Sequence, residues 1–192
     1  MLQIKDVTKV FNPGTVNEKL ALDHFSLTLE NGDFVTIIGG NGAGKSTMMN
    51  AIAGVWPVDS GQIIIDGTDV TKLSEHKRAA FLGRVFQDPM TGTAATMGIE
   101  ENLALAKRRG KKRFLGPGIT KKEREEYREL LKILDLGLED RLTSKVGLLS
   151  GGQRQALTLL MASLQKPKLL LLDEHTAAGI ITKFKKGINK PT

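Results

Sequence analysis

The eight residues Gly39-Gly40-Asn41-Gly42-Ala43-Gly44-Lys45-Ser46 decide the fold of this 192-residue chain. They match the pattern G-x-x-x-x-G-K-[ST], in which glycines let the backbone curl so that successive N–H groups point at phosphate oxygens. The apolar, β-branched run before the loop predicts a strand over residues 34–38, buried on both faces. The residues after the loop have helical spacing and predict a helix over 46–54, whose N-terminus favours an anion.

Two side chains of this loop would complete a triphosphate site. Lys45 would reach the β- and γ-phosphates, and the Ser46 hydroxyl would bind Mg²⁺. Asn41 is expected to shape the turn, and its amide could also contact phosphate. The alternative is a glycine-rich turn followed by Lys-Ser by chance, and the context of strand before and helix after argues against it.

Two adjacent carboxylates follow a second apolar run. Leu169–Leu172 predicts a short buried strand, and Asp173 and Glu174 come directly after it. Ligands of open α/β sheets bind at this end of a strand. Asp173 would therefore hold Mg²⁺, directly or through water, and Glu174 would orient or deprotonate an attacking water. The alternative is a strand that ends in an ordinary polar turn.

A serine and two glycines open a further predicted helix, over residues 153–165. The stretch Leu149-Ser150-Gly151-Gly152-Gln153 presents a hydroxyl and free N–H groups, which together favour a second anion site. One chain with two phosphate-binding helix N-termini suggests that two chains share nucleotides.

With these motifs, the sequence resembles the nucleotide-binding domain of ABC transporters over residues 2–178. The run 149–155 looks like the family's signature motif, and its Ser150 lies 23 residues before Asp173, as in the family pattern. Val85-Phe86-Gln87-Asp88-Pro89 looks like the Q-loop, and Asp59-Ser60-Gly61 with Asp66-Gly67 looks like the early β-ribbon. Phe11 stands where the family places an aromatic ring that stacks on adenine.

The resemblance assigns a role to each residue of the motifs. Glu174 and Gln87 would be catalytic, with Glu174 as the base and Gln87 contacting Mg²⁺ or the lytic water and reporting its state to a membrane partner. Three residues would hold the metal: Ser46, Gln87 and Asp173. The nucleotide would contact Phe11, Gly39, Asn41, Gly42, Ala43, Gly44, Lys45, Ser46 and Thr47, and also Ser150, Gly151, Gly152 and Gln153 of a second copy.

The resemblance also implies the fold and the assembly. It implies an α/β P-loop NTPase (RecA-like) core with an N-terminal antiparallel β subdomain and an inserted helical subdomain. The expected boundaries are 1–89 for the β subdomain and first part of the ATP-binding core, 90–148 for the helical subdomain, 149–178 for the signature helix and the core strand that leads to Asp173, and 179–192 for a divergent basic tail. The expected function is ATP-driven solute transport, most simply import, with ATP and Mg²⁺ as cofactors. Expected partners are transmembrane permease subunits, a second copy across the ATP site and a solute-binding protein, with the chain peripheral on the cytoplasmic face of the cell membrane.

Composition and charge narrow the alternatives. The chain has no cysteine and no run of about 20 apolar residues, so a disulfide scaffold and a spanning helix are excluded. Its net charge of +7 is local, because residues 107–113 hold six bases and 179–192 hold four, and without these ten the remaining 18 bases face 21 acids. The first cluster is interpreted as a solvated loop, with contact to anionic lipid or a partner as the alternative. No nucleic-acid partner is expected, since only Phe114 accompanies these bases.

Shorter signals predict the remaining elements. Alternating residues predict strands near 2–10 and 25–29, and the two turns at 59–61 and 66–67 predict a β-ribbon between them. Thr120 with Glu123 has the spacing of a capping box and predicts a helix start. Trp56 and Tyr127 are interpreted as packing residues.

The family pattern stops near residue 179. A lysine-rich, acid-free stretch replaces the segment that would cross the dimer, and no histidine follows His175. We expect a chain truncated or frameshifted near this point, which would bind ATP but hydrolyse it weakly. A divergent but functional short form, a nucleotide-binding remnant without turnover, and a soluble non-transport ABC ATPase are the alternatives.

Overall fold

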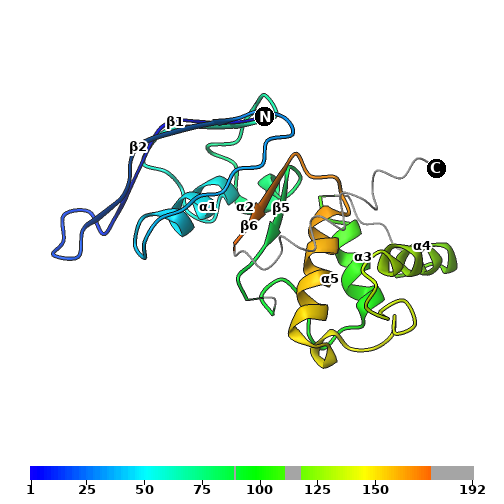
Figure 1. The fold of residues 1–192 in the computed structure, drawn as a ribbon. Coiled ribbons are helices and arrows are strands. Elements are labelled where there is room, and N and C mark those ends of the chain that lie inside the picture. The colour runs from blue at the N-terminus through cyan, green and yellow to red at the C-terminus, as the bar shows by residue number, and fades with distance from the viewer. Residues whose placement is uncertain (89, 111–117, 174–192) are drawn as a thin grey trace. The chain divides into compact units, whose positions relative to one another are not determined.

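The computed structural model describes residues 1–88, 90–110 and 118–173 (Figure 1). It divides into two compact units, Met1–Leu82 and Gly83–Thr192. The first unit contains the elements β1 (Leu2–Phe11), β2 (Lys19–Leu29), α1 (Lys45–Ala53), β3 (Ser60–Ile65), β4 (Thr68–Asp69) and α2 (Glu75–Arg78). The strand β5 (Leu82–Val85) begins at the boundary, and the second unit continues with α3 (Ile99–Lys107), α4 (Lys121–Lys132), η1 (Val146–Leu148), α5 (Gly151–Ser163) and β6 (Leu169–Leu172).

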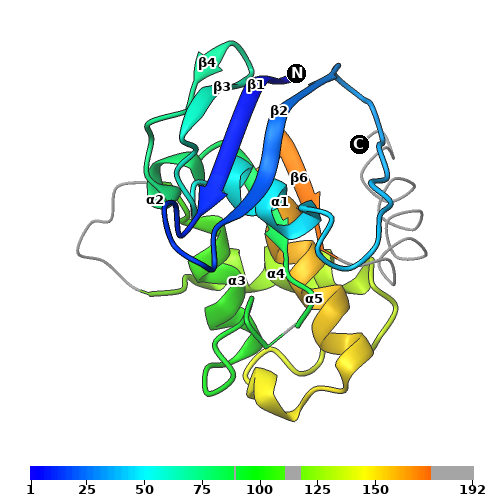
Figure 2. The same ribbon diagram turned by 90° about the vertical axis from the view of Figure 1, so that its left-hand side faces the viewer.

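A four-stranded antiparallel sheet, in the order β2-β1-β3-β4, forms the first unit (Figure 2). Leu2 of β1 pairs with Leu29 of β2 on one side and with Ile65 of β3 on the other. Leu2, Ile4 and Ile63 are almost completely buried, because their alternation places them on the same face. The strands predicted near 2–10 and 25–29 are confirmed, and the second is longer than predicted.

The hairpin between β3 and β4 follows directly from its two turn residues. Asp66 has a φ of 49° and Gly67 a φ of 78°, the two left-handed positions that a two-residue type I′ turn requires. The predicted β-ribbon is therefore confirmed.

The helix α1 begins after Gly44 and ends at Gly54, whose left-handed backbone caps its last turn. It contacts β2 and lies beneath the sheet in Figure 1. The side chain of Arg78, only 1% exposed, donates to the carbonyl oxygens of Ala51 at 2.5 Å and Ile52 at 2.9 Å. The predicted helix over 46–54 is confirmed, starting one residue earlier.

The predicted strand over 34–38 is wrong. The structure has no strand there, and Phe34 is 65% exposed and Ile38 91% exposed. An apolar, β-branched run becomes a buried strand only where neighbouring strands and packed faces exist to receive it. Within the described ranges, no strand pairs with this run.

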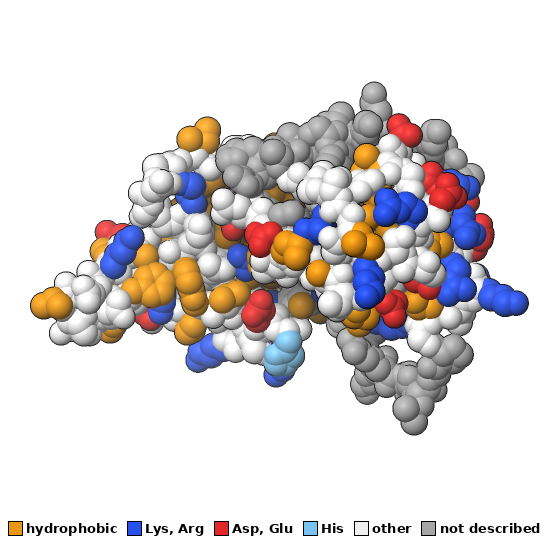
Figure 3. All heavy atoms as spheres, turned by 90° about the horizontal axis from the view of Figure 1, so that it is seen from below, with side chains coloured by type: hydrophobic (Ala, Val, Ile, Leu, Met, Phe, Trp, Pro, Cys, Tyr) orange, Lys and Arg blue, Asp and Glu red, His pale blue; other side chains and the backbone are white. Residues whose placement is uncertain are grey.

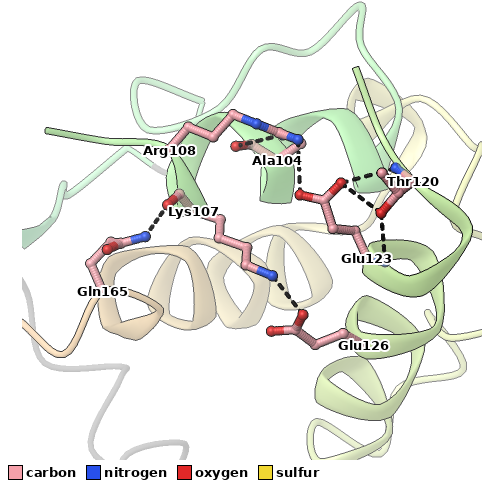
Figure 4. A network of polar contacts seen from close by, with 7 residues as sticks. All are labelled: Ala104, Lys107, Arg108, Thr120, Glu123, Glu126 and Gln165. Carbon is pink, nitrogen blue, oxygen red and sulfur yellow. Dashed lines mark hydrogen bonds and ion pairs between the residues drawn. The ribbon is translucent and has the colours of Figure 1, made fainter. Parts of the chain in front are cut away.

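The second unit is built around the helices α3, α4 and α5 and a two-stranded sheet of β5 and β6. Its core includes Leu103 of α3, Tyr127 and Leu131 of α4, and Leu157 of α5, each with no exposed surface. The capping box predicted for α4 is confirmed, because the Thr120 hydroxyl accepts from the N–H of Glu123 and the Glu123 carboxylate accepts from the N–H of Thr120 (Figure 4). The strand predicted at 169–172 is confirmed as β6.

Ion pairs occupy part of the basic cluster that the sequence places at 107–113. Lys107 pairs with Glu126 at 2.5 Å and Arg108 with Glu123 at 2.8 Å (Figure 4). Basic and acidic side chains are interspersed on the face of this unit that Figure 3 shows. Lys107 and Arg108 are thus paired with α4, whereas Arg109 donates to the carbonyl oxygen of Ala162 at 3.4 Å. Residues 111–113 lie outside the described residues. Across the described ranges, no helix has the length and apolar character needed to cross a bilayer.

Candidate nucleotide-binding site

Two glycines fix the path of the loop between residues 39 and 46. Gly42 has a φ of 83° and Gly44 a φ of 82°, which is the left-handed region that favours glycine. A β-carbon at Gly44 would lie 2.5 Å from the carbonyl oxygen of Ala21 on β2, so a side chain there is excluded by the backbone of the sheet. The loop therefore packs closely against β2 at one point and is exposed elsewhere.

Lys45 folds over the loop that precedes it. Its Nζ donates to the carbonyl oxygen of Gly40 at 2.8 Å and also to that of Gly39. Asn41 and Ser46 are exposed. Thus the loop presents one ammonium group, a hydroxyl and the N-terminal amides of α1 at the surface, a set of groups that binds oxyanions.

The register of β1 and β2 connects the predicted adenine platform to this loop. Phe11, the last residue of β1, pairs with Lys19, the first residue of β2. The Lys19 Nζ lies 3.7 Å from the position a β-carbon would take at Gly42. The aromatic ring and the loop therefore belong to one surface of the first unit. Lys19 is not predicted as a site residue from the sequence, because its place beside the loop depends on strand register and not on any local signal.

The ring of Phe11 is held by its neighbours. Its centroid lies 4.9 Å from that of Trp56, with the two planes at 82°, and the Lys9 Nζ lies 5.5 Å from the Phe11 centroid. Lys9 pairs with Asp59 at 3.0 Å, and Asp59 also accepts from the N–H of Val10 at 2.6 Å. The bond from Val10 and then the bond from Lys9 lower the pKa of Asp59 below its ordinary value. Trp56, which the sequence predicts as a packing residue, packs edge-to-face with Phe11.

The second unit holds the other predicted metal ligands. The N–H of Asp173 donates to the carbonyl oxygen of Val85 at 3.0 Å, two residues before Gln87. This bond brings the ends of β5 and β6 together, so Asp173 and Gln87 lie at the same edge of that sheet. Asp173 is half-buried and Gln87 is exposed. Glu174, the predicted catalytic base, lies outside the described residues.

The start of α5 is where the sequence predicts a second anion site. The Ser150 hydroxyl accepts from the N–H of Gln153 at 3.3 Å, and the Gln153 side chain accepts from the N–H of Ser150 at 3.1 Å. Ser150, Gly151 and Gly152 are exposed, and a β-carbon at either glycine would meet no atom within 4 Å. The glycines are therefore not required by packing, and they leave the helix N-terminus open to a ligand.

Arg154 fixes the segment before this helix start. Its guanidinium donates to the carbonyl oxygens of Gly147 and Leu149, both at 3.1 Å, and contacts the sulfur of Met90. These bonds connect the turn that carries Ser150 to the residues that follow Gln87.

Each unit offers hard oxygen ligands of the kind Mg²⁺ prefers. In the first unit Ser46 offers a hydroxyl, and in the second unit Asp173 offers a carboxylate and Gln87 an amide oxygen. Within the described residues there is no group of three or more His, Cys, Asp or Glu that could hold a metal ion without help. A Mg²⁺ bound through one or two protein oxygens and the substrate's phosphates needs no such group.

Comparisons with known proteins agree on one family. A family model described as ABC transporter matches residues 22–177. The tyrosine transport ATP-binding protein of Clostridioides difficile is 48% identical over 183 residues, which cover 93% of this chain and 70% of the relative. The methionine import ATP-binding protein of Corynebacterium diphtheriae is 38% identical, with 92% and 50% covered. The spermidine/putrescine import ATP-binding protein of Pasteurella multocida is 34% identical, with 93% and 44% covered. The chain thus spans about half the length of the last two.

Solved structures show the same likeness. A dimeric ATP-binding cassette in a post-hydrolysis state, bound to ADP and Pi, has a TM-score of 0.78 at 28% identity, covering 97% of this chain and 82% of its own. A dimeric bacterial ABC transporter cassette has a TM-score of 0.77 at 30% identity, covering 97% and 79%. These likenesses confirm the predicted α/β P-loop NTPase fold.

Proposed function

This chain belongs to the ABC transporter family, and on that premise we propose that it is the ATP-binding and ATP-hydrolysing subunit of a membrane importer. One observation carries the proposal. The loop with Gly42 and Gly44 in left-handed conformations sets a half-buried Lys45 and an exposed Ser46 at the N-terminus of α1, beside the aromatic end of β1. This arrangement suits a triphosphate with an attached base.

The proposed chemistry is mainly positioning and charge neutralisation, because phosphoryl transfer leaves little covalent work for a protein. In this proposal, the loop amides and Lys45 bind the β- and γ-phosphates, and Phe11 stacks on the adenine. Ser46, Gln87 and Asp173 would hold Mg²⁺, which when bound would neutralise charge on the phosphate oxygens. Glu174 orients or deprotonates the attacking water.

The same proposal includes a second copy of the chain. The exposed start of α5, with Ser150, Gly151 and Gly152, would close on the γ-phosphate held by Lys45 and Ser46 of that copy. The dimeric cassettes to which this chain is similar support the arrangement. Transmembrane permease subunits and a solute-binding protein would complete the transporter at the cytoplasmic face of the membrane. Tyrosine is the first solute to test, because the tyrosine transport relative is 48% identical.

A second candidate is a nucleotide-binding protein with little or no turnover. The observation that favours it is the lysine-rich, acid-free stretch 179–192, which lies beyond the family match that ends at residue 177. Both candidates bind MgATP, so only the hydrolysis of the bound ATP separates them.

Calorimetry with MgATP, followed by steady-state phosphate release, tests both candidates on one preparation. Binding with turnover that Glu174→Gln abolishes supports the importer subunit. Binding with the same negligible phosphate release in the unmodified chain and in Glu174→Gln supports the second candidate. Absence of MgATP binding would contradict both.

A further inference from the structure

Trp56 makes an aromatic contact that the proposed function does not use. The rings of Trp56 and Phe11 are nearly perpendicular, at 82°, with centroids 4.9 Å apart. This is the edge-to-face geometry that aromatic pairs favour. Both side chains are half-buried, so each ring keeps an exposed part.

Trp56 is attached to the end of the helix that starts at the phosphate loop. After Gly54 ends α1, the N–H groups of Val55 and Trp56 both donate to the carbonyl oxygen of Asn50, at 3.0 and 3.4 Å. Trp56 therefore follows the last turn of α1 without a flexible linker. Lys45 stands at the first turn of the same helix.

A second set of contacts confines Phe11 independently of Trp56. Lys9, whose side chain is 11% exposed, lies over the Phe11 ring and pairs with Asp59. Asp59 is joined to β1 by its own N–H, which donates to Thr8 at 2.9 Å, and by the N–H of Val10. These contacts hold the Phe11 ring close to β1, and the contact with Trp56 sets the direction of the plane of that ring.

We propose that Trp56 is a positioning residue that orients Phe11 to stack on a purine base and sets its place relative to the phosphate-binding end of α1. The inference rests on the proposed function, in which Phe11 stacks on adenine. It adds that α1 carries both ends of the nucleotide site: the phosphate loop at its N-terminus and the support of the base platform at its C-terminus.

A residue with this role affects the base and not the phosphates. Loss of the Trp56 ring would leave the loop, Lys45 and Ser46 intact but free the Phe11 ring to turn. Affinity for MgATP should then fall while affinity for magnesium tripolyphosphate, which has no base, stays the same. A residue that merely stabilised the fold would weaken both ligands alike.

The test is calorimetric titration of the full chain with MgATP and with magnesium tripolyphosphate. We expect Trp56→Leu to weaken MgATP about five- to tenfold, in keeping with the size of an aromatic pair, and to change tripolyphosphate less than twofold. Trp56→Phe should restore most of the MgATP affinity because it keeps a ring edge. Should Trp56→Leu fail to fold, Trp56→Met provides a longer and more flexible side chain without a ring for the same comparison.

Phe11→Leu separates this inference from the proposed function. If Phe11→Leu weakens MgATP and Trp56→Leu does not, or if Trp56→Leu weakens both ligands equally, the inference is wrong and the base platform stands. If Phe11→Leu leaves MgATP affinity unchanged, the platform itself fails and the inference falls with it. Trp56 is the sole tryptophan, so in the unmodified chain its fluorescence should respond to MgATP and not to tripolyphosphate. A response to neither ligand, or equally to both, would contradict the inference without any variant.

Discussion

The Nζ of Lys45 lies 2.8 Å from the carbonyl oxygen of Gly40, five residues earlier in the same loop. The ammonium group thus already lies against the loop and offsets the partial negative charge of carbonyl oxygens that would repel a phosphate. In Lys45→Met this charge is lost while α1 keeps its backbone bonds, so we expect MgATP affinity to fall at least about tenfold with little change in melting temperature. Calorimetry and thermal denaturation together check this, and unchanged affinity would contradict the assigned role.

Gly44 and Gly40 form a matched pair for testing the loop. In Gly44→Ala the β-carbon would meet the Ala21 carbonyl oxygen and the residue would keep a φ of 82°, so we expect nucleotide binding to be lost and stability to fall. Gly40→Ala meets no atom within 4 Å and has no left-handed φ, so it should fold normally. Equal stability of the two variants would show that the loop conformation described here is wrong.

Because the start of α5 is exposed, a substitution there should lower ATP turnover without lowering the free energy of unfolding. In Gly152→Ala the new methyl group enters open space in a helix, where alanine is favoured over glycine by about 1 kcal/mol. We therefore expect the free energy of unfolding to hold or rise, while ATP turnover falls because the methyl group obstructs the facing nucleotide. If turnover is unaffected in a preparation of the unmodified chain that is active, the start of α5 does not approach the nucleotide.

Among these substitutions, we expect the replacement of Arg78 to lower the free energy of unfolding most. Its buried guanidinium donates to the carbonyl oxygens of Ala51 and Ile52, and also to those of Leu73 at 2.9 Å and Thr71 at 2.8 Å. Arg78→Met would remove the guanidinium bonds to all four carbonyl oxygens, of which that of Ala51 keeps the bond from the N–H of Gly54, and we expect unfolding free energy to fall by about 3 kcal/mol. Arg128→Met is the control, because its exposed pair with Glu125 contributes about 0.5 kcal/mol or less. If urea denaturation gave similar losses of unfolding free energy in the two variants, the stabilising role of the Arg78 hydrogen bonds would be contradicted.

Tyr127, the only tyrosine, gives a direct optical check of the helical core. Burial is the main cause that raises the pKa of its phenol from 10.0 to about 12. Because the folded pKa is the higher one, this contribution to stability is complete below pH 10 and is lost as the pH rises toward 12. Absorbance titration of the phenolate should therefore show a midpoint near 12, with unfolding free energy declining over the same interval. A midpoint near 10 in the folded chain would show that the ring is exposed.

The features that the sequence predicts well are those that few consecutive residues determine. The capping box of Thr120 and Glu123 and the turn at Asp66 and Gly67 depend on local backbone geometry, and both occur as predicted. The run 34–38 shows the opposite case, because burial on both faces needs partners that the run itself does not contain. Lys19 and Trp56 were missed as site residues for a similar reason: strand register and the end of α1 bring them to the loop and to Phe11.

The exposed run 34–38 has a consequence for how copies of the chain behave in concentrated solution. It is uncharged, four of its five residues are β-branched, and it lacks proline. This composition is typical of segments that form intermolecular β-sheets. The net charge of +7 opposes such encounters by mutual repulsion. That repulsion acts over about 10 Å at 0.1 M salt and about 3 Å at 1 M. The colloidal stability of the protein is therefore electrostatic, and concentrated salt removes it.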